Sequence, residues 1–148
     1  TRCSQRLRLQ VNEILETSML NYLPRGFLII NGLIYGILAA LFVISPSVWF
    51  ANLGIEPVVP MGYTELRTMY VGMMGSLAVF SLIGAVFISM REPALVLFLI
   101  SYAALATVRS WGIFVEGLFD DLTLRLLYAE ILSAALALIS LLCHRLSD

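Results

Sequence analysis

Four long apolar segments dominate the alternation of hydrophobic and polar positions along the chain. They cover residues 27–49, 68–90, 94–115 and 122–143. Each is close to the roughly 20 residues that an α-helix needs to cross the hydrocarbon core of a bilayer. The connections are too short to carry the chain back across a membrane, so successive spans should run antiparallel. The pattern predicts an all-α membrane protein whose four transmembrane helices form an up-down-up-down bundle.

The first 25 residues show a different pattern. Apolar residues recur at near-helical spacing with polar residues between them: Leu7, Val11, Ile14, Leu15, Met19, Tyr22 and Leu23. This spacing predicts an amphipathic helix, which Pro24 and Gly26 should break before the first span. We expect this helix to lie in the headgroup plane, with docking on a partner protein as the alternative. The predicted division is an amphipathic N-terminal segment, residues 1–25, and a four-helix transmembrane domain, residues 26–148.

Composition supports a membrane protein. Hydrophobic residues make up 60% of the chain and charged residues 13%, whereas soluble domains have about 45–50% and about 25%. The mean hydropathy is +0.93. The net charge of −1 says little about partners, and we expect no nucleic-acid partner. The expected partners are membrane lipids and other membrane protein subunits.

The arginines predict an orientation. With four spans both termini share one side, and that side holds Arg2, Arg6, Arg8, Arg25, Arg91 and Arg145. The positive-inside rule places this side in the cytoplasm, stroma or matrix. The chain begins at Thr1, which fits either a trimmed initiator or a removed presequence, and its acid-free, arginine-containing start suits the mature edge of an organellar transit peptide. The expected membrane is a bacterial inner membrane or an organellar one, thylakoid or inner.

Charged residues interrupt the apolar segments on or toward the opposite side. Arg109 and Glu130 lie at the same depth, about 15 Å from the turn near Phe119 at 1.5 Å per helical residue, so they should face each other as an ion pair. Glu116 shares a helical face with Arg109, and Arg125 is placed to pair with it. Glu65 and Arg67 open the second span, with Thr64 as the expected N-cap.

Two interpretations of these polar residues remain open. They form a buried network that fixes the packing of the helices, or they line a pocket for a headgroup, quinone or other small amphiphile. The candidate residues are Glu65, Arg67, Tyr70, Arg109, Glu116, Arg125, Tyr128 and Glu130, and Tyr102 is a further source of a hydroxyl. Met69, Met73 and Met74 are expected to pack rather than bind metal, because no His or Cys accompanies them.

Small residues predict where helices approach closely. Stripes with small-xxx-small spacing occur on three spans: Gly32, Gly36 and Ala40; Gly72 and Ser76; Ala129, Ser133 and Ala137. We expect packing within the chain rather than dimerisation.

Catalytic signals are weak. The single histidine, His144, lies on the side away from the acidic cluster, and metal-ligand spacing, a phosphate loop and a nucleophile elbow are missing from the sequence. We assign no catalytic residue and no metal ligand. The sequence requires no cofactor and is compatible with a bound lipid or pigment.

One resemblance covers residues 27–142. The run TELRTMYVG at 64–72, the turn at Arg91, Arg109 in the third span and YAE at 128–130 resemble an uncharacterised bacterial family of four-helix membrane proteins, a domain of unknown function loosely similar to DoxX-like proteins. The resemblance implies a four-helix bundle with Glu65, Arg67, Arg109 and Glu130 at recurring polar positions. It implies no reaction.

These observations favour a non-catalytic accessory subunit of a larger membrane complex, such as a photosynthetic or respiratory energy-converting complex. The alternative is a small-amphiphile binding or transfer protein that uses the region of Arg109 and Glu130. An oligomeric transporter is a third hypothesis.

Overall fold

The computed structural model describes residues 2–117 and 119–147, with the side chains of residues 22–117 and 119–146. The elements, in order, are α1 (Arg2–Ile44), α2 (Pro46–Asn52), α3 (Pro60–Arg67), the π-helical turn η1 (Thr68–Gly72), α4 (Met73–Val86), the 3-10 turn η2 (Ile88–Met90), α5 (Arg91–Phe114) and α6 (Asp121–Ser147). The described residues contain no strand. The predicted all-α class is confirmed.

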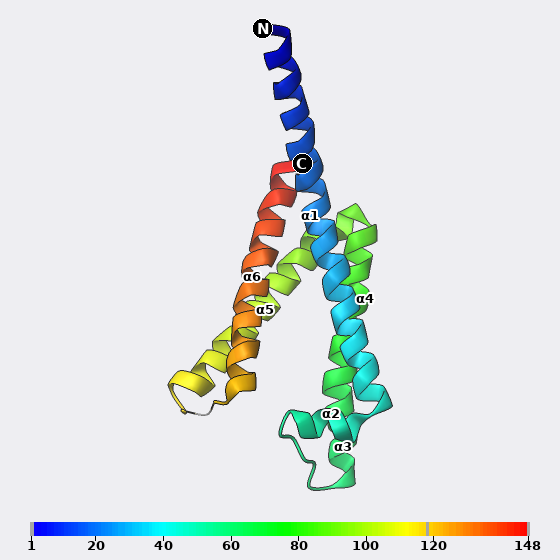
Figure 1. The fold of residues 1–148 in the computed structure, drawn as a ribbon. Helices are drawn as coiled ribbons and strands as arrows, with labels where there is room; N and C mark the ends of the chain where they lie inside the picture. The colour runs from blue at the N-terminus through cyan, green and yellow to red at the C-terminus, as the bar shows by residue number, and fades with distance from the viewer. Residues whose placement is uncertain (1, 118, 148) are drawn as a thin grey trace.

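Four helical stretches are long and apolar enough to cross a membrane, which makes this a multi-pass membrane protein. They are Tyr22–Ile44, Pro60–Val86, Ile88–Phe114 and Asp121–Leu146. Along Figure 1 the chain descends through α1, rises through α3 and α4, descends through α5 and rises through α6. The arrangement is the up-down-up-down order that the short connections predict.

The N-terminal segment is not separated from the first span. Helix α1 runs through Pro24 without a break for 43 residues, so the predicted break at Pro24 and Gly26 is wrong. A proline removes one backbone hydrogen bond, but membrane helices tolerate this where neighbouring elements stabilise the backbone, and Pro24 is fully buried. The amphipathic face expected for residues 1–25 rests on side chains that, up to residue 21, lie outside the described ones.

The second span begins earlier than predicted. Pro60 occupies the first turn of α3, a position where proline is favoured because its missing N–H has no helical partner. Thr64 therefore lies inside α3 and is not an N-cap, and Val59 precedes the helix. At the end of the first span, Pro46 begins α2, so α1 ends at Ile44 instead of continuing to Trp49.

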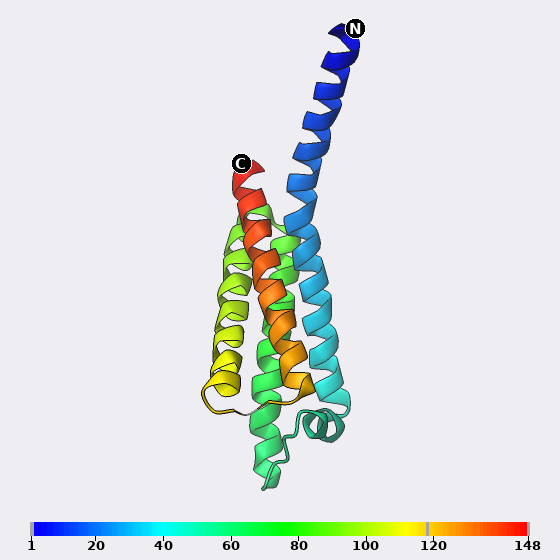
Figure 2. The ribbon, with the colours of Figure 1, turned by 60° about the vertical axis from the view of Figure 1, so that its left-hand side comes forward.

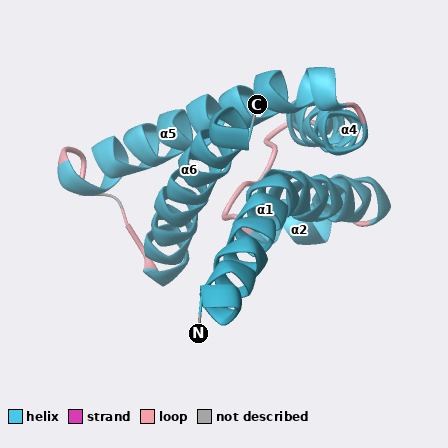
Figure 3. Ribbon diagram, turned by 90° about the horizontal axis from the view of Figure 1, so that it is seen from above, coloured by secondary structure: helices cyan, strands magenta, loops and turns pink. Residues whose placement is uncertain are grey.

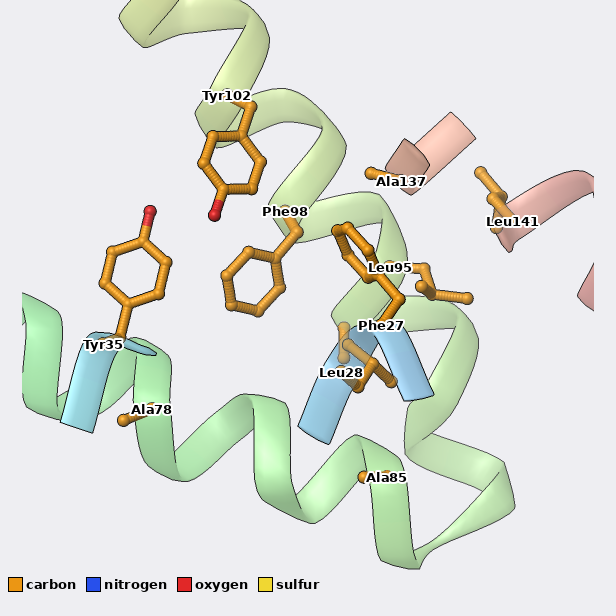
Figure 4. Packing of buried hydrophobic residues seen from close by; sticks show 11 residues of the cluster. Phe27, Leu28, Tyr35, Ala78, Ala85, Leu95, Phe98, Tyr102, Ala137 and Leu141 are labelled. Carbon is orange, nitrogen blue, oxygen red and sulfur yellow. The ribbon is translucent and has the colours of Figure 1, made fainter. Parts of the chain in front are cut away.

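The main core lies in the half of the bundle nearer the termini. Figure 4 shows Phe98 of α5 between Tyr35 and Phe27 of α1, with Leu95 one turn away and Ala78 and Ala85 lining α4. Helices α1 and α4 approach closely at Gly32, where an added Cβ would lie 2.8 Å from the Leu82 side chain. A second aromatic cluster near the other end joins α1, α2 and the second span through Phe42, Phe50 and Tyr70, whose ring centroids are 4.9–5.4 Å apart.

The bundle consists of two helix pairs that separate toward the end far from the termini. Helices α1 and α4 form one pair and α5 and α6 the other, and Figures 1 and 3 agree that the α5–α6 connection lies well away from α2 and α3. Val108 of α5 is 72% exposed and Tyr128 of α6 is 71% exposed. The two pairs are in close contact near the termini and apart at the opposite end.

Candidate functional site

Arg109 and Glu130 form a two-pronged ion pair between α5 and α6. The Arg109 Nε donates to Glu130 Oε2 over 2.9 Å, and Nη2 donates to Oε1 over 2.7 Å. Glu130 is only 7% exposed. Paired N–H donors on both carboxylate oxygens are the strongest arrangement open to these groups. The contact expected from their equal depth is present.

A second set of buried polar groups joins α1 to α5. The Asn31 Nδ2 donates to the Phe27 carbonyl over 2.8 Å, and the Tyr102 hydroxyl donates to Asn31 Oδ1. In Figure 4 the hydroxyl groups of Tyr35 and Tyr102 point toward each other. Tyr102 also lies beside Ser133, one helical turn from Glu130. These groups form a chain of polar side chains from α1 through α5 to α6.

Asn31 and Tyr35 are absent from the site predicted by sequence. A signal for Asn31 does exist, because an amide inside an otherwise apolar span is a costly polar group that needs a partner. Tyr35 gives no such signal, since tyrosine is common in apolar helices and only the fold brings its hydroxyl toward Tyr102.

Most of the other predicted polar residues lie outside this network. Glu65, Arg67, Glu116 and Arg125 are exposed, as is Tyr128. No ion pair joins Glu116 to Arg125 among the side chains that the structure describes. These residues lie near helix ends in the half where the two pairs separate, so water or headgroups can solvate them without a protein partner. Tyr70 packs against Phe42 and Phe50, and it also lies close enough to Arg109 to interact with it electrostatically.

The small residues of the predicted stripes likewise fall into two groups, one packed against another helix and one exposed. Gly32 and Gly36 lie against α4, and Ala137 is fully buried. Ser133 is half-buried beside Tyr102. Ala40, Gly72, Ser76 and Ala129 are exposed and mark no helix contact within the chain. Spacing alone identifies a small-residue face, but only packing decides whether another helix covers it.

A cavity of about 360 Å³ lies away from Arg109 and Glu130. It is lined by Val43 of α1, Arg67 at the end of α3, and Thr68, Val71 and Gly72 of η1. A Cβ added to Gly72 would meet no atom within 4 Å. π-helical turns are frequent at functional sites. This pocket offers space for a small ligand beside Arg67, near the helix ends.

The polar side chains of the network bind one another. Arg109 and Glu130 neutralise each other, and the Asn31 amide and the Tyr102 hydroxyl bond to each other. In the part of the chain with described side chains, no three His, Cys, Asp or Glu residues lie close enough together to hold a metal ion.

Comparison with known proteins gives no relative. No protein-family model, curated protein or solved structure matches this chain significantly. The resemblance to the bacterial four-helix family therefore remains an expectation from its motif residues.

Proposed function

We propose that this chain is a non-catalytic accessory subunit of a larger membrane protein complex. The observation that carries the proposal is the length of α1. The helix has 43 residues, of which Tyr22–Ile44 belong to the membrane span, and in Figures 1 and 2 its N-terminal part extends alone beyond the ends of α4, α5 and α6. We call residues 2–21 the arm.

An arm of this length needs a packing partner to be stable as a helix. Isolated helices shorter than about 12–15 residues are marginal in water and somewhat longer ones gain most of their stability by packing an apolar face. The sequence of the arm has such a face, with Val11 and Leu15 one helical turn apart and Gln10 and Thr17 at polar positions. Most of the arm extends beyond the ends of the other described helices (Figure 2). A neighbouring subunit would cover that face.

The interior of the bundle supports the same function. Its most deeply placed charged groups, Arg109 and Glu130, bind each other, and the cavity lies outside their contact. The outer surface of α1 is strongly apolar, with Ile30, Leu33 and Ile37 all more than half exposed. Lipids or the spans of other subunits would cover this surface.

The test is purification of the full chain from its native membrane in mild detergent, with native mass measurement and identification of what accompanies it. We expect stoichiometric recovery with other subunits, and we expect Val11→Glu/Leu15→Glu to release the protein. The matched control, Gln10→Glu/Thr17→Glu, places two carboxylates on the polar side of the arm and should stay bound. A full chain that runs as a free monomer would refute the proposal.

The cavity favours a second candidate function, binding of a small anionic amphiphile. Arg67 would hold the acidic group while Val43 and Val71 contact the apolar part. Binding of a fluorescent fatty acid by the purified protein tests this function. Gly72→Leu should block binding by filling the cavity, whereas Gly75→Leu, also with open space at its Cβ but outside the cavity lining, should leave it intact. Equal binding by wild type and Gly72→Leu would exclude this candidate.

A further inference from the structure

Arg91 is a buried arginine at the end of the bundle nearer the termini. It is the first residue of α5 and is 8% exposed. Its spacing from Ala94, Leu95 and Phe98, all fully buried, places it on the inward face of the helix. The sequence assigned Arg91 only to a turn on the positively charged side. The structure places it inside the packed end of the bundle.

No side chain that the structure describes pairs with the Arg91 guanidinium. Its Nε is buried without a hydrogen-bond partner, and neither ion pair among the described side chains includes it. The adjacent carboxylate, Glu92, accepts a hydrogen bond from the Nε of Arg145 over 2.8 Å, and the Arg145 Nη2 lies 2.6 Å from the same oxygen as an ion pair. Buried charges in proteins are almost always paired, because removing an unpaired charge from water carries a large desolvation penalty. An anion from outside the described chain would supply the counter-ion that Arg91 lacks among the described side chains.

The packing around Arg91 limits the direction from which a counter-ion can arrive. One turn further into the bundle, α4 and α5 meet so tightly that a Cβ on Gly84 would lie 2.6 Å from the Ala94 Cβ and 3.2 Å from Leu28 Cδ1. The bundle is closed on that side. The open direction is toward the end of the spans, since the apolar stretch Ile88–Phe114 begins three residues before Arg91. That end is where lipid headgroups lie.

We propose that Arg91 anchors a binding site for the phosphate of an anionic lipid headgroup. The planar guanidinium matches the oxygens of a phosphate and is less strongly hydrated than an ammonium group. Arg25 and Arg145 lie near the same end and are exposed, and Glu92 is already neutralised by Arg145. The local charge therefore favours an anion. This inference does not depend on the function proposed above.

The test measures thermal unfolding of the full chain in an uncharged detergent as phosphatidylglycerol or phosphatidylcholine is added. We expect phosphatidylglycerol to raise the Tm of the wild type and phosphatidylcholine to leave it unchanged. Arg91→Met should start from a higher Tm, because it removes an unpaired buried charge, and should lose the response to phosphatidylglycerol. Arg25→Met, which removes an exposed arginine near the same end, is the matched control and should keep the response.

A more conservative variant and a second readout cover the case in which Arg91→Met does not fold. Arg91→Lys keeps the charge but loses the paired donors, and native mass spectrometry should show roughly tenfold or greater loss of retained phosphatidylglycerol, as expected for a charge-assisted hydrogen bond. Equal lipid retention by wild type and Arg91→Lys would overturn the proposal. So would a Tm rise with inorganic phosphate as large as that with phosphatidylglycerol, which would indicate a site for a free anion. A copurifying protein lost only in the Arg91 variants would assign the counter-ion to a partner carboxylate and overturn it too.

Discussion

At the scale of single residues, the polar groups deep in the bundle hydrogen-bond to one another. Glu130 accepts hydrogen bonds from two donors of Arg109, and the Asn31 side-chain oxygen accepts one from Tyr102. The first contact joins the successive helices α5 and α6, and the second joins α1 to α5, which are distant in sequence. The polar side chains therefore restrict how the helices can pack, because any shift of α5 relative to α1 or α6 would break them.

Breaking the ion pair from one side should be costly, whereas removing both partners should not. We expect Arg109→Met to destabilise the protein by about 3–5 kcal/mol, because the buried Glu130 carboxylate is left uncompensated. Glu130→Met should cost less, because the Arg109 side chain it leaves unpaired is 26% exposed and water can solvate it. The double variant should recover most of that loss. Unfolding of the four proteins in detergent gives the coupling energy, and Arg125→Met, at an exposed position, is the control. Additive losses would show that the two groups do not act as a pair.

The Asn31–Tyr102 contact gives a second expectation at this scale. Tyr102→Phe leaves Asn31 Oδ1 buried without its donor, which should lower the free energy of unfolding by roughly 1–3 kcal/mol. Tyr128→Phe removes the hydroxyl of a side chain that is 71% exposed and should change little. The same unfolding measurement decides, and equal effects of the two substitutions would contradict a special role for the buried hydroxyl.

At the scale of elements, the contact of α4 with the start of α5 depends on Gly84. Alanine at this position would place its Cβ 2.6 Å from that of Ala94 and 3.1 Å from the Met90 carbonyl oxygen, so we expect a loss of about 1–3 kcal/mol from overpacking. Gly75→Ala, also within α4 but with no atom within 4 Å, should be neutral or stabilising because alanine favours helix. Circular dichroism during thermal unfolding compares the two. Equal Tm values would show that the helices move apart without cost.

The start of α6 should depend on pH. The Asp120 carboxylate accepts hydrogen bonds from the Thr123 hydroxyl over 2.6 Å and from the Thr123 N–H over 2.7 Å, and these bonds hold the pKa of Asp120 below its ordinary value of about 4. Because the folded pKa is lowered, the stabilisation is fully present above the ordinary pKa and is lost as the pH falls through the lowered one.

Hydrogen exchange at the Thr123 amide measures this effect. Protection should decline with acidification in the wild type and stay constant in Asp120→Asn, which retains an acceptor but does not titrate. A parallel decline in both proteins would assign the pH dependence to another group.

The elements also show what sequence can and cannot predict. The four spans follow from length and hydropathy, and the Arg109–Glu130 contact follows from equal depth on antiparallel neighbours. The errors in the predicted helix boundaries occur at prolines. Pro24 is tolerated inside α1, whereas Pro60 and Pro46 begin helices, and the difference depends on tertiary packing that local sequence does not contain. Exposure of Glu116 and Arg125 likewise depends on the divergence of two helix pairs, which no residue pattern specifies.

At the scale of the whole molecule, stability is distributed unevenly along the bundle. The buried cluster around Phe98 and Leu95 occupies the end nearer the termini, and the helix pairs separate at the other end (Figures 1 and 3). Regions with few buried contacts open at lower free energy than packed cores. The end far from the termini is thus the end where the molecule can change shape.

Hydrogen exchange in detergent should report this difference in local stability between the two ends of the bundle. Backbone amides of α5 after Leu105 and of α6 before Glu130 should exchange earlier than those around Leu95, Phe98 and Ala137. Peptide-level mass spectrometry resolves these segments. Uniform protection along α5 would show that the two helix pairs are held together over their full length.

The π-helical turn Thr68–Gly72 fixes which way the lower part of the second span faces. A π-turn accommodates one residue more than an α-helical turn, and each residue of an α-helix advances the chain by about 100° about the axis. Every residue from Pro60 to Arg67 is therefore rotated by about that angle from where a regular helix continuing from α4 would place it. Deleting one residue within this turn would rotate Arg67 away from the cavity and leave the packing of α4 on α1 unchanged. The turn therefore sets the rotation of one part of the span relative to the other.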